Sequence, residues 1–498
     1  MEINFEKEKY RDFIKMLVLY CLIYGVMLVP HYSADSFAYN VNPLQNNTGN
    51  LALGRIGDYF TNQIVVKLGG NYVRQQFLFV FILILTLAIV TNGLFKFFLK
   101  IYPHNLGKCA RNILKIVLIL MFSNIFLMEW FIFVEMTFIW SLSLLFMFWS
   151  VIQVRDKFTI KQMACSSILL TISVSFYQAT IGFYVFFALM SVYVANDGRL
   201  DKKSFLNSVK VMVCGAVGGG FNLGFIKVMQ LLGLVSVTGR TENMSVQMLL
   251  NNVRIILNNI VKWLFDAYGL LPRYTLIIFV VIIYTLLVIY FVQEKCSIFD
   301  IIYVLLLIMA CNVMVYLPHL MTSAVWMAQR TIASFLILIT LPVLVIIFRE
   351  KKQNFLCFNF VVLVILLGIN VYEIQTISVD MIASNRIDQE VAYLINDKIV
   401  DYENATGEKI NNISICKDLY PTWGNKSIKH VCLDTNLRVF NVSHSGVHCI
   451  NYYNETNYNA VEMPENVYKE YFENKNWDML NLDEQMIFDG DTVYLASY

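Results

Sequence analysis

Eleven runs of apolar residues fill the first three quarters of the chain and constrain its fold more than any other feature. Apolar runs of about 17–25 residues are long enough to cross a bilayer as helices. The runs are 13–30, 76–95, 113–128, 133–150, 163–177, 180–195, 209–235, 274–292, 298–317, 331–348 and 355–373. Several runs are separated by only a few residues, which predicts tight helical hairpins over 113–150 and 163–195. We therefore expect a polytopic all-α membrane protein with about 11 transmembrane helices over residues 1–373.

The distribution of charge separates this body from the rest of the chain. Only 15% of the residues are charged, well below the share that soluble proteins carry. Residues 374–498 hold 9 Lys and Arg against 19 Asp and Glu, whereas residues 1–373 hold 29 against 17. An apolar, basic body excludes a soluble enzyme, a disordered chain and a nucleic-acid binder as the class of protein. The acidic tail, with segments such as NISICKDL and TVYLASY, is typical of a small α+β domain over 374–498.

The Lys and Arg residues between the runs predict the orientation of the body, since these residues accumulate in cytoplasmic loops. With the N-terminus inside, the inner segments contain 20 Lys and Arg and the outer loops contain 8. We therefore expect a multi-pass protein with a cytoplasmic N-terminus. Because the number of runs is odd, the C-terminal domain is expected outside. In an oxidising outer compartment, two of Cys416, Cys432 and Cys449 could form a disulfide.

The first outer loop, 31–75, is long for a compact bundle, and long structured loops are often functional. It places Asp35 at the outer end of the first run. Arg55 and Asp58 are three residues apart, and the apolar spacing of residues 53–67 predicts a helix on which the two share a face. The alternative is a solvated loop in which Arg55 and Asp58 form a surface ion pair worth under ~1 kcal/mol.

The next two outer turns carry further polar residues. Glu129 and Glu135 lie in MEWFIFVEMTF, where a turn between two helices can bring them together. Carboxylates so close to hydrocarbon usually face a cavity or a partner; the alternative is that both lie in the headgroup zone. Tyr177 and Gln178 lie in SVSFYQAT, where the alternative to a functional role is an interfacial tyrosine followed by a turn amide.

The last two outer segments are also unusual. In 236–273, apolar residues from Leu249 to Leu264 recur at helical spacing while polar residues occupy the other faces, which predicts a periplasmic helix lying in the membrane interface. Such a helix could shelter a lipid chain, or it could simply cap the bundle. Arg330 begins the tenth run on the outer side, against the general charge bias.

Acids and arginines on the outer face of an apolar bundle suit glycosyl transfer from a lipid-linked phosphate. A positioned carboxylate can act as the base for an attacking hydroxyl. Arginine offers a planar, bidentate fork to the departing phosphate. A donor of this kind requires a membrane body, because its polyprenyl tail would lie between the helices, in contact with membrane lipid.

The order of these motifs resembles the type II Gtr family, bacterial serotype-converting O-antigen glucosyltransferases of the polytopic GT-C superfamily. The resemblance is carried by Asp35, by Gly54–Arg55 in LALGRIGDYF, by the acidic turn MEWFIFVEM, by the motif SFYQA and by Arg330. ASNRIDQEVAYLINDKI, at the start of the tail, is also similar. The family often has a second Asp directly after the first, whereas this chain has Ser36; Glu129 or Glu135 would then supply the second acid.

The resemblance implies transfer of glucose from undecaprenyl-phosphate-glucose to a sugar hydroxyl of lipid-linked O-antigen, with inversion at the sugar carbon, on the periplasmic face of the bacterial inner membrane. Carried over by position, Asp35 would be the general base, and Glu129 and Glu135 would be acceptor or supporting acids. The donor-phosphate and substrate-binding residues would be Arg55, Asp58, Tyr177, Gln178 and Arg330. A carboxylate base with a monophosphate donor requires no metal, so we expect neither a metal nor another cofactor.

The tail is expected to help choose the acceptor polysaccharide. Its aromatic residues Tyr420, Trp423, Tyr452 and Tyr453 could stack on sugar faces; the alternative is that they are ordinary core and surface residues. Two other classes of membrane protein are alternatives to a transferase. An O-antigen polymerase would keep its chemistry in two large internal loops rich in Arg, and not in a terminal domain. A polysaccharide or lipid-linked sugar transporter would show paired repeats and charges at the bilayer midplane, whereas here the charges cluster outside.

Overall fold

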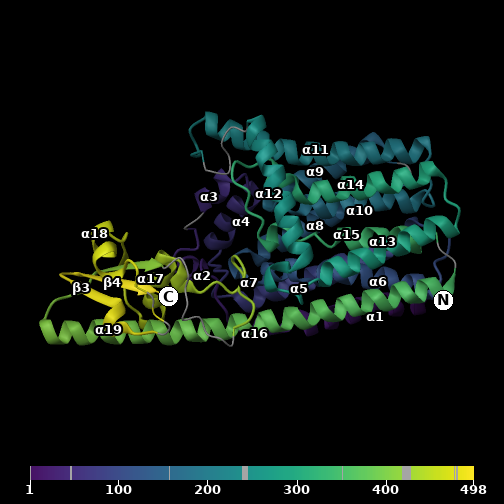
Figure 1. Cartoon of the computed structure of the whole chain (residues 1–498). Coiled ribbons are helices and arrows are strands. Elements are labelled where there is room, and N and C mark those ends of the chain that lie inside the picture. The colour runs from purple at the N-terminus through teal and green to yellow at the C-terminus, as the bar shows by residue number, and fades with distance from the viewer. Residues whose placement is uncertain are drawn as a thin grey trace.

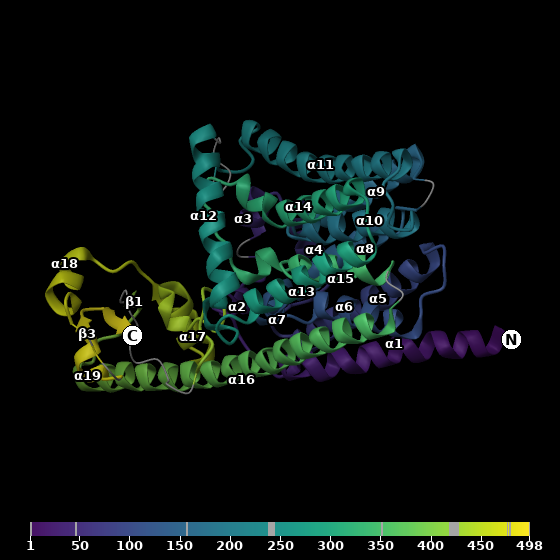
Figure 2. The ribbon, with the colours of Figure 1, turned by 45° about the vertical axis from the view of Figure 1, so that its right-hand side comes forward.

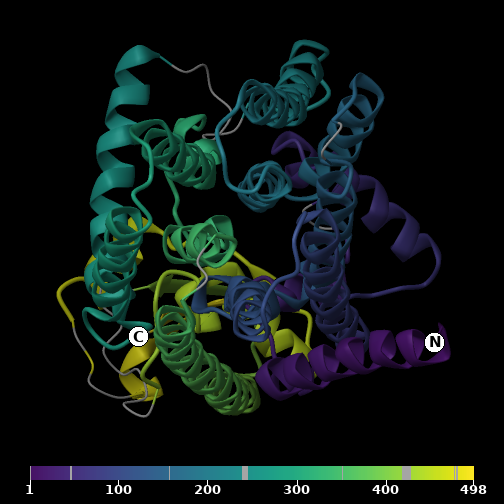
Figure 3. The ribbon, with the colours of Figure 1, turned by 90° about the vertical axis from the view of Figure 1, so that its right-hand side faces the viewer.

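The computed structural model describes the chain except for residues 1, 45–46, 156–157, 238–244, 350–351, 418–427, 476, 478–479 and 498. Figure 1 shows an elongated bundle of roughly parallel helices, with a small domain of helices and strands beyond one end of it. In Figure 3, which looks along the bundle, most of these helices are seen nearly end-on. The two expected parts of the molecule are therefore visible as a helical body and a mixed tail.

The body is built from twelve long and short helices within the described residues. They are α1 (Glu2–Tyr24), α5 (Gln76–Ile101), α6 (Lys108–Phe122), α7 (Ile125–Ile132), α8 (Thr137–Val151), α9 (Ile160–Phe176), α10 (Thr180–Ala195), α11 (Lys202–Leu231), α13 (Thr275–Gln293), α14 (Ile298–Leu320), α15 (Ile337–Ile347) and α16 (Gln353–Thr406). Short 3-10 turns η2 (Val134–Met136) and η4 (Gln329–Ile332) precede α8 and α15. Each of the eleven predicted runs lies mostly in helix, although run 113–128 is broken at residues 123–124 and run 331–348 contains a turn at 333–336.

Among the described residues, seven helices are long and apolar enough to cross a membrane, or eight if the bent pair α6 and α7 counts as one span. The composition is that of a membrane protein. Helices α9 and α10 are apolar but shorter, and the first half of α1 is rich in charged residues. A count of eleven spans thus stays a prediction that rests on the sequence pattern.

Polar residues fix the places where the helices begin. Thr159 caps α9 in a reciprocal pair of hydrogen bonds with Gln162, and Asp201 caps α11 in the same way with Ser204. Between α6 and α7, the side chain of Asn124 accepts hydrogen bonds from two backbone N–H groups of α7. The two helices meet there at a bend of 46°. The bend matters for function because α7 carries Glu129.

The first outer loop folds into short helices at the end of the bundle nearest the tail, as Figure 1 shows. They are α2 (Ser36–Val41), α3 (Asn47–Ala52) and α4 (Ile56–Lys67), and the 3-10 turn η1 (Gly25–Leu28) precedes the loop. The segment 236–273 contains helix α12 (Val246–Phe265) and the turn η3 (Ala267–Gly269). Figure 2 shows α12 running across the same end of the bundle, at a steep angle to the long helices.

Helix α12 has three distinct faces. One face packs on the body through Asn252, Ile256 and Trp263, which are buried. A second face exposes apolar side chains at helical spacing, and a third exposes polar ones. The exposed apolar residues include Val246, Leu250, Val253, Leu257 and Val261. This pattern supports the predicted position of the helix at a membrane surface.

Helix α16 joins the body to the tail without a break. It contains 54 residues, which makes it about 80 Å long, and Figure 1 shows it running from the bundle into the tail domain. The expected domain boundary at 373/374 lies inside this helix. The change in charge at residue 374 therefore does not coincide with the end of a helix, and Ile377 and Met381 beyond it still belong to the apolar core of the body.

The tail contains a small mixed sheet of four strands, in the order β2–β1–β4–β3. The strands are β1 (Asn412–Lys417), β2 (Asn459–Ala460), β3 (Met486–Asp489) and β4 (Thr492–Ser497). Strand β1 is parallel to both β2 and β4, and β3 is antiparallel to β4. The remaining elements are η5 (Val439–Asn441), α17 (Ser443–Asn454), α18 (Glu465–Val467), η6 (Tyr468–Phe472) and α19 (Leu482–Gln485).

The core of the tail lies between α16, α17 and the sheet. It contains Ile395, Ile399, Ile413 and Val493, together with Phe37 from α2 of the body. Phe37 therefore ties the first outer loop to the tail. The three tail cysteines belong to three different apolar clusters, with Cys416, Cys432 and Cys449 each in its own.

Candidate functional site

Two adjoining cavities lie at the tail-facing end of the bundle. The first has a volume of about 620 Å³ and contains charged side chains from four separate segments. It is lined by Asp35, Tyr39, Gly49, Asn50, Leu53, Arg55, Phe133, Glu135, Met136, Trp140, Tyr177, Ala324 and Arg330. Five of the eight predicted site residues therefore meet in one cavity, which we call the polar cavity.

Asp35 and Glu135 form the acidic side of the polar cavity. Asp35 precedes the first residue of α2, and its backbone N–H donates to the hydroxyl of Ser33 over 3.2 Å. Glu135 lies in η2 and is almost fully buried. It accepts hydrogen bonds from Ser33 over 3.1 Å and from Ser36 over 3.0 Å. Ser36 thus brings a carboxylate from another helix to the place where the family often has its second Asp.

Arg330 forms the basic side of the cavity together with Arg55. The backbone N–H of Arg330 donates to Glu129 Oε2 over 2.6 Å, and its Nη1 donates to Glu129 Oε1 over 2.8 Å. The guanidinium lies over the ring of Phe133 at 4.5 Å from the centroid. Trp130 adds a hydrogen bond from its indole N–H to the carbonyl of Arg330. These contacts hold both the backbone and the guanidinium of Arg330.

Glu129 occupies a different position from Glu135. It is fully buried in α7 and does not line the polar cavity. Both of its oxygens contact Arg330. The turn between α7 and α8 therefore separates the two acids. Glu135 lines the polar cavity, whereas Glu129 binds Arg330 without lining the cavity itself.

Arg55 and Asp58 are not a solvated surface pair. Arg55 directly precedes helix α4, which begins at Ile56 and not at residue 53 as the apolar spacing suggested. Its guanidinium lies 5.0 Å from the ring centroid of Tyr177. Asp58 is fully buried and accepts a hydrogen bond from Asn62 over 2.7 Å. Asp58 lies behind Arg55, outside the cavity wall.

Tyr177 and Gln178 connect the polar cavity to the second one. Tyr177 follows α9 and is buried, with its ring edge-on to Trp130 and inclined to Trp140 at centroid distances of 5.7 and 5.6 Å. Gln178 donates from Nε2 to the carbonyl of Leu53 over 2.8 Å. The tyrosine is therefore packed within the protein and is not an interfacial residue exposed to the headgroups.

The second cavity is an apolar groove of about 420 Å³ between α11, α14 and the turn between α9 and α10. Small residues on α11, namely Gly215, Ala216, Gly219 and Gly220, form one of its walls. It shares Leu53, Arg55, Tyr177 and Ala324 with the polar cavity. An apolar groove thus ends beside two arginines and two carboxylates.

The surroundings of Asp35 act on its pKa in opposite directions. Burial raises the pKa of Asp35, while the charges of Arg330 and His444 pull that pKa down. Burial also raises the pKa of Asp58, to about 7, against the effects of Arg55 and of the hydrogen bond from Asn62. A carboxylate with a raised pKa is a stronger base once it has lost its proton. Asp35 is the better placed of the two, because it faces the cavity.

Several residues near this site are absent from the sequence-based prediction. Asp434 of the tail contacts Arg330, and Tyr39, Asn50 and Trp140 line the polar cavity. Motif order gives no signal for them, because their proximity depends on contacts between distant segments. Of the aromatic residues proposed for the tail, Tyr420 and Trp423 lie outside the described residues. Tyr452 and Tyr453 pack against Tyr32 and Phe37 of the first outer loop.

Among the described residues, no group of three or more His, Cys, Asp or Glu side chains is placed to hold a metal ion. The charged groups that do converge are carboxylates and guanidiniums, which bind and transfer protons and phosphates directly. An apolar helical bundle that encloses such groups beside an apolar groove has the features of a membrane-embedded transferase.

Comparison with known families identifies the transferase. The family model described as Glucosyl transferase GtrII matches residues 24–347, about two thirds of the chain, and the chain belongs to this family. It is therefore a glucosyltransferase, and the predicted resemblance is confirmed. The match includes all eight predicted site residues and ends before Asp434. Neither curated proteins nor solved structures gave a match.

Proposed function

We propose that the protein transfers glucose from a polyprenyl-phosphate donor, undecaprenyl-phosphate-glucose, to a sugar hydroxyl of lipid-linked O-antigen. The observation that carries this proposal is the junction of the two cavities. The polar cavity, with its acids and arginines, shares a wall with the apolar groove. The apolar chain of such a donor would lie in the groove, and its phosphate and sugar would lie in the adjoining polar cavity.

The groove is suited to the polyprenyl chain. Its wall on α11 includes three glycines and an alanine, and a Cβ atom added at Gly220 would meet no atom within 4 Å. The space that side chains leave there is available to a flexible hydrocarbon. Arg55 lies at the junction and Arg330 lies in the polar cavity, so the phosphate of the donor would meet two guanidiniums as the chain enters the groove.

Asp35 is the proposed base. It would accept the proton of the acceptor hydroxyl as the oxygen of that hydroxyl attacks C1 of glucose. The bond between C1 and the phosphate oxygen would break, and polyprenyl phosphate would leave with the electron pair. Attack opposite the departing phosphate inverts the configuration, so a β-linked donor would give an α-linked branch. Glu135 would bind the acceptor, and Glu129 would hold Arg330 in place.

We further propose that this end of the bundle faces the periplasm, with the body in the bacterial inner membrane. The support is the Lys and Arg bias of the loops and the three faces of α12, which crosses the bundle at this end. Reporter fusions test this orientation: a fusion in loop 31–75 should report the periplasm and one at Asp197 the cytoplasm. The reverse result would contradict it.

The central experiment is an in vitro assay with purified protein, undecaprenyl-phosphate-glucose and lipid-linked O-antigen. We expect one glucose per acceptor site and release of polyprenyl phosphate. Asp35→Asn should lose activity while the protein stays folded. Asp197→Asn is the matched control, because Asp197 follows α10 at the opposite end of the bundle. Full activity in Asp35→Asn would remove Asp35 as the base, and lengthening or movement of the polysaccharide without glucose transfer would indicate a polymerase or a transporter.

A further inference from the structure

The tail reaches Arg330 through a tight turn that carries Asp434. Cys432 and Thr435 exchange two backbone hydrogen bonds, of 3.1 and 2.8 Å, across this turn. Asp434 Oδ2 lies 2.7 Å from Nη1 of Arg330, the same nitrogen that contacts Glu129. The side chains of Arg330 and Asp434 are only 18% and 22% exposed. One guanidinium nitrogen is therefore held between a carboxylate of the body and a carboxylate of the tail.

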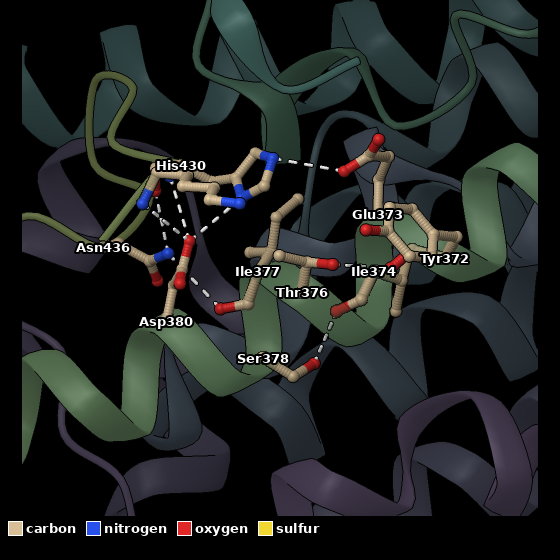
Figure 4. Close-up of polar contacts among 10 residues, drawn as sticks. Tyr372, Glu373, Ile374, Thr376, Ile377, Ser378, Asp380, His430 and Asn436 are labelled. Atoms are coloured by element: carbon tan, nitrogen blue, oxygen red, sulfur yellow. Dashed lines mark hydrogen bonds and ion pairs between the residues drawn. The ribbon is translucent and has the colours of Figure 1, made fainter. Parts of the chain in front are cut away.

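The first anchor of this turn is His430, on its N-terminal side. Nδ1 of His430 lies 2.9 Å from Asp380 Oδ2, and Nε2 lies 3.1 Å from Glu373 Oε2. The backbone N–H groups of Lys429 and His430 also donate to Asp380 Oδ2. Figure 4 shows the ring of His430 between these two carboxylates of α16. Asn436 completes the anchor with a hydrogen bond to the carbonyl of His430.

The second anchor is Arg438, on the C-terminal side of the turn. Its Nε donates to Asp388 Oδ1 over 2.5 Å, and the backbone N–H of Val439 donates to Asp388 Oδ2 over 3.3 Å. Asp388 is almost fully buried on α16. Because α16 is one continuous helix from the bundle into the tail, both anchors fix the turn relative to the body.

We propose that Asp434 is a positioning residue of the transferase, and that residues 428–438, which we call the anchored loop, complete the active site from the tail. This inference rests on the proposed function, since it assigns Arg330 to the donor phosphate. The anchored loop lies outside residues 24–347, which the family model matches, and the inference gives this loop a role in the reaction.

Asp434 can affect the reaction because the side chain of Arg330 is long and flexible unless other groups hold it. A long side chain loses conformational freedom when it is held in one orientation, and two carboxylates on one nitrogen hold the guanidinium before the donor arrives. The departing phosphate gains negative charge as the bond to glucose breaks. An arginine that is already oriented stabilises this charge mainly in the transition state. Loss of that orientation should therefore lower kcat more than it raises KM.

The test compares Asp434→Asn, Asp434→Glu and Asp483→Asn in the full-length protein. Asp483 is the matched control, because it forms an ion pair with Lys398 on the exposed surface of the tail. We expect Asp434→Asn to lower kcat roughly tenfold to a hundredfold with little change in the KM for the donor. Asp434→Glu should recover part of this loss, and Asp483→Asn should match the wild type. A wild-type kcat in Asp434→Asn would overturn the inference.

A second measurement requires no substrate. In a double-mutant cycle of thermal unfolding, Asp434→Asn and Arg330→Gln should together lower Tm by clearly less than the sum of their separate effects. Additive effects would show that Asp434 does not hold Arg330. A wild-type protein that transfers no glucose would contradict the proposed function, whereas the thermal cycle still decides the role of Asp434.

Discussion

Ser36 donates a hydrogen bond to Glu135 Oε2 over 3.0 Å, although the two residues are 99 positions apart in the chain. Ser33 donates to the other oxygen of the same carboxylate. The hydroxyls thereby hold a buried acid beside Asp35 in the wall of the polar cavity. The site thus contains two acids, as a family pattern with adjacent aspartates would, but it takes the second one from another helix.

This relationship makes Ser36→Asp an informative change. A carboxylate at position 36 would meet Glu135 in a buried site, and two like charges there oppose each other. We expect Ser36→Asp to lower the free energy of unfolding by about 3 kcal/mol, and Ser36→Asp combined with Glu135→Gln to recover most of it. Thermal unfolding of the purified protein measures both. Equal stability of the single and the double variant would contradict the contact.

Four of the five predicted residues that line the polar cavity follow a local rule. Asp35, Glu135, Tyr177 and Arg330 are polar residues near the ends of apolar runs, and roughly parallel helices bring such ends together. Arg55 lies within loop 31–75, and its position depends on how that loop folds. Helical periodicity therefore predicted both the body and the place where polar residues would meet. It could not predict which acid faces the cavity, because the bend at Asn124 and the turn before α8 decide the directions of Glu129 and Glu135.

Two other features depend on contacts that no local pattern contains. Asp434 reaches Arg330 across 104 positions of the sequence, through a loop fixed by His430 and Arg438. Composition also does not predict that α16 continues through residue 373. Composition reports the surroundings of a helix, and these change from apolar to aqueous while the backbone hydrogen bonds continue.

The pH dependence of the transferase should respond to His444. As the base, Asp35 must be deprotonated, so activity should rise as pH increases through its pKa. His444 lowers that pKa by its positive charge, and His444→Gln should therefore move the acidic limb of the kcat/KM profile to higher pH. His104→Gln, an exposed change in another loop, is the control. An acidic limb that stays in place or moves to lower pH would contradict an electrostatic role for His444.

Asp58 should make stability fall with rising pH. Its pKa is raised from 3.8 to about 7 in the folded protein, chiefly by burial. The stability that the protonated form of Asp58 contributes is complete below pH 3.8 and is lost as pH rises from there through about 7. The total effect is at most about 4 kcal/mol. Asp58→Asn, which remains neutral, should exceed the stability of the wild type by more at pH 8 than at pH 5, as measured by thermal unfolding. Parallel pH curves for the two proteins would show that Asp58 ionises normally.

Filling the apolar groove should affect the donor chain and leave the chemistry intact. Gly220 lies on the groove wall, and a side chain there would enter open space. Gly220→Leu should therefore raise the KM for a long-chain polyprenyl-phosphate-glucose about tenfold, because hydrocarbon contacts are lost, while kcat stays close to the wild-type value. A donor with a short prenyl chain should be much less affected, since it does not reach the blocked part of the groove. Gly368→Leu is the matched control: Gly368 also has no atom within 4 Å of an added Cβ, but it lies on α16 away from the groove. If Gly220→Leu and Gly368→Leu behave alike with the long-chain donor, the hydrocarbon must bind elsewhere on the body.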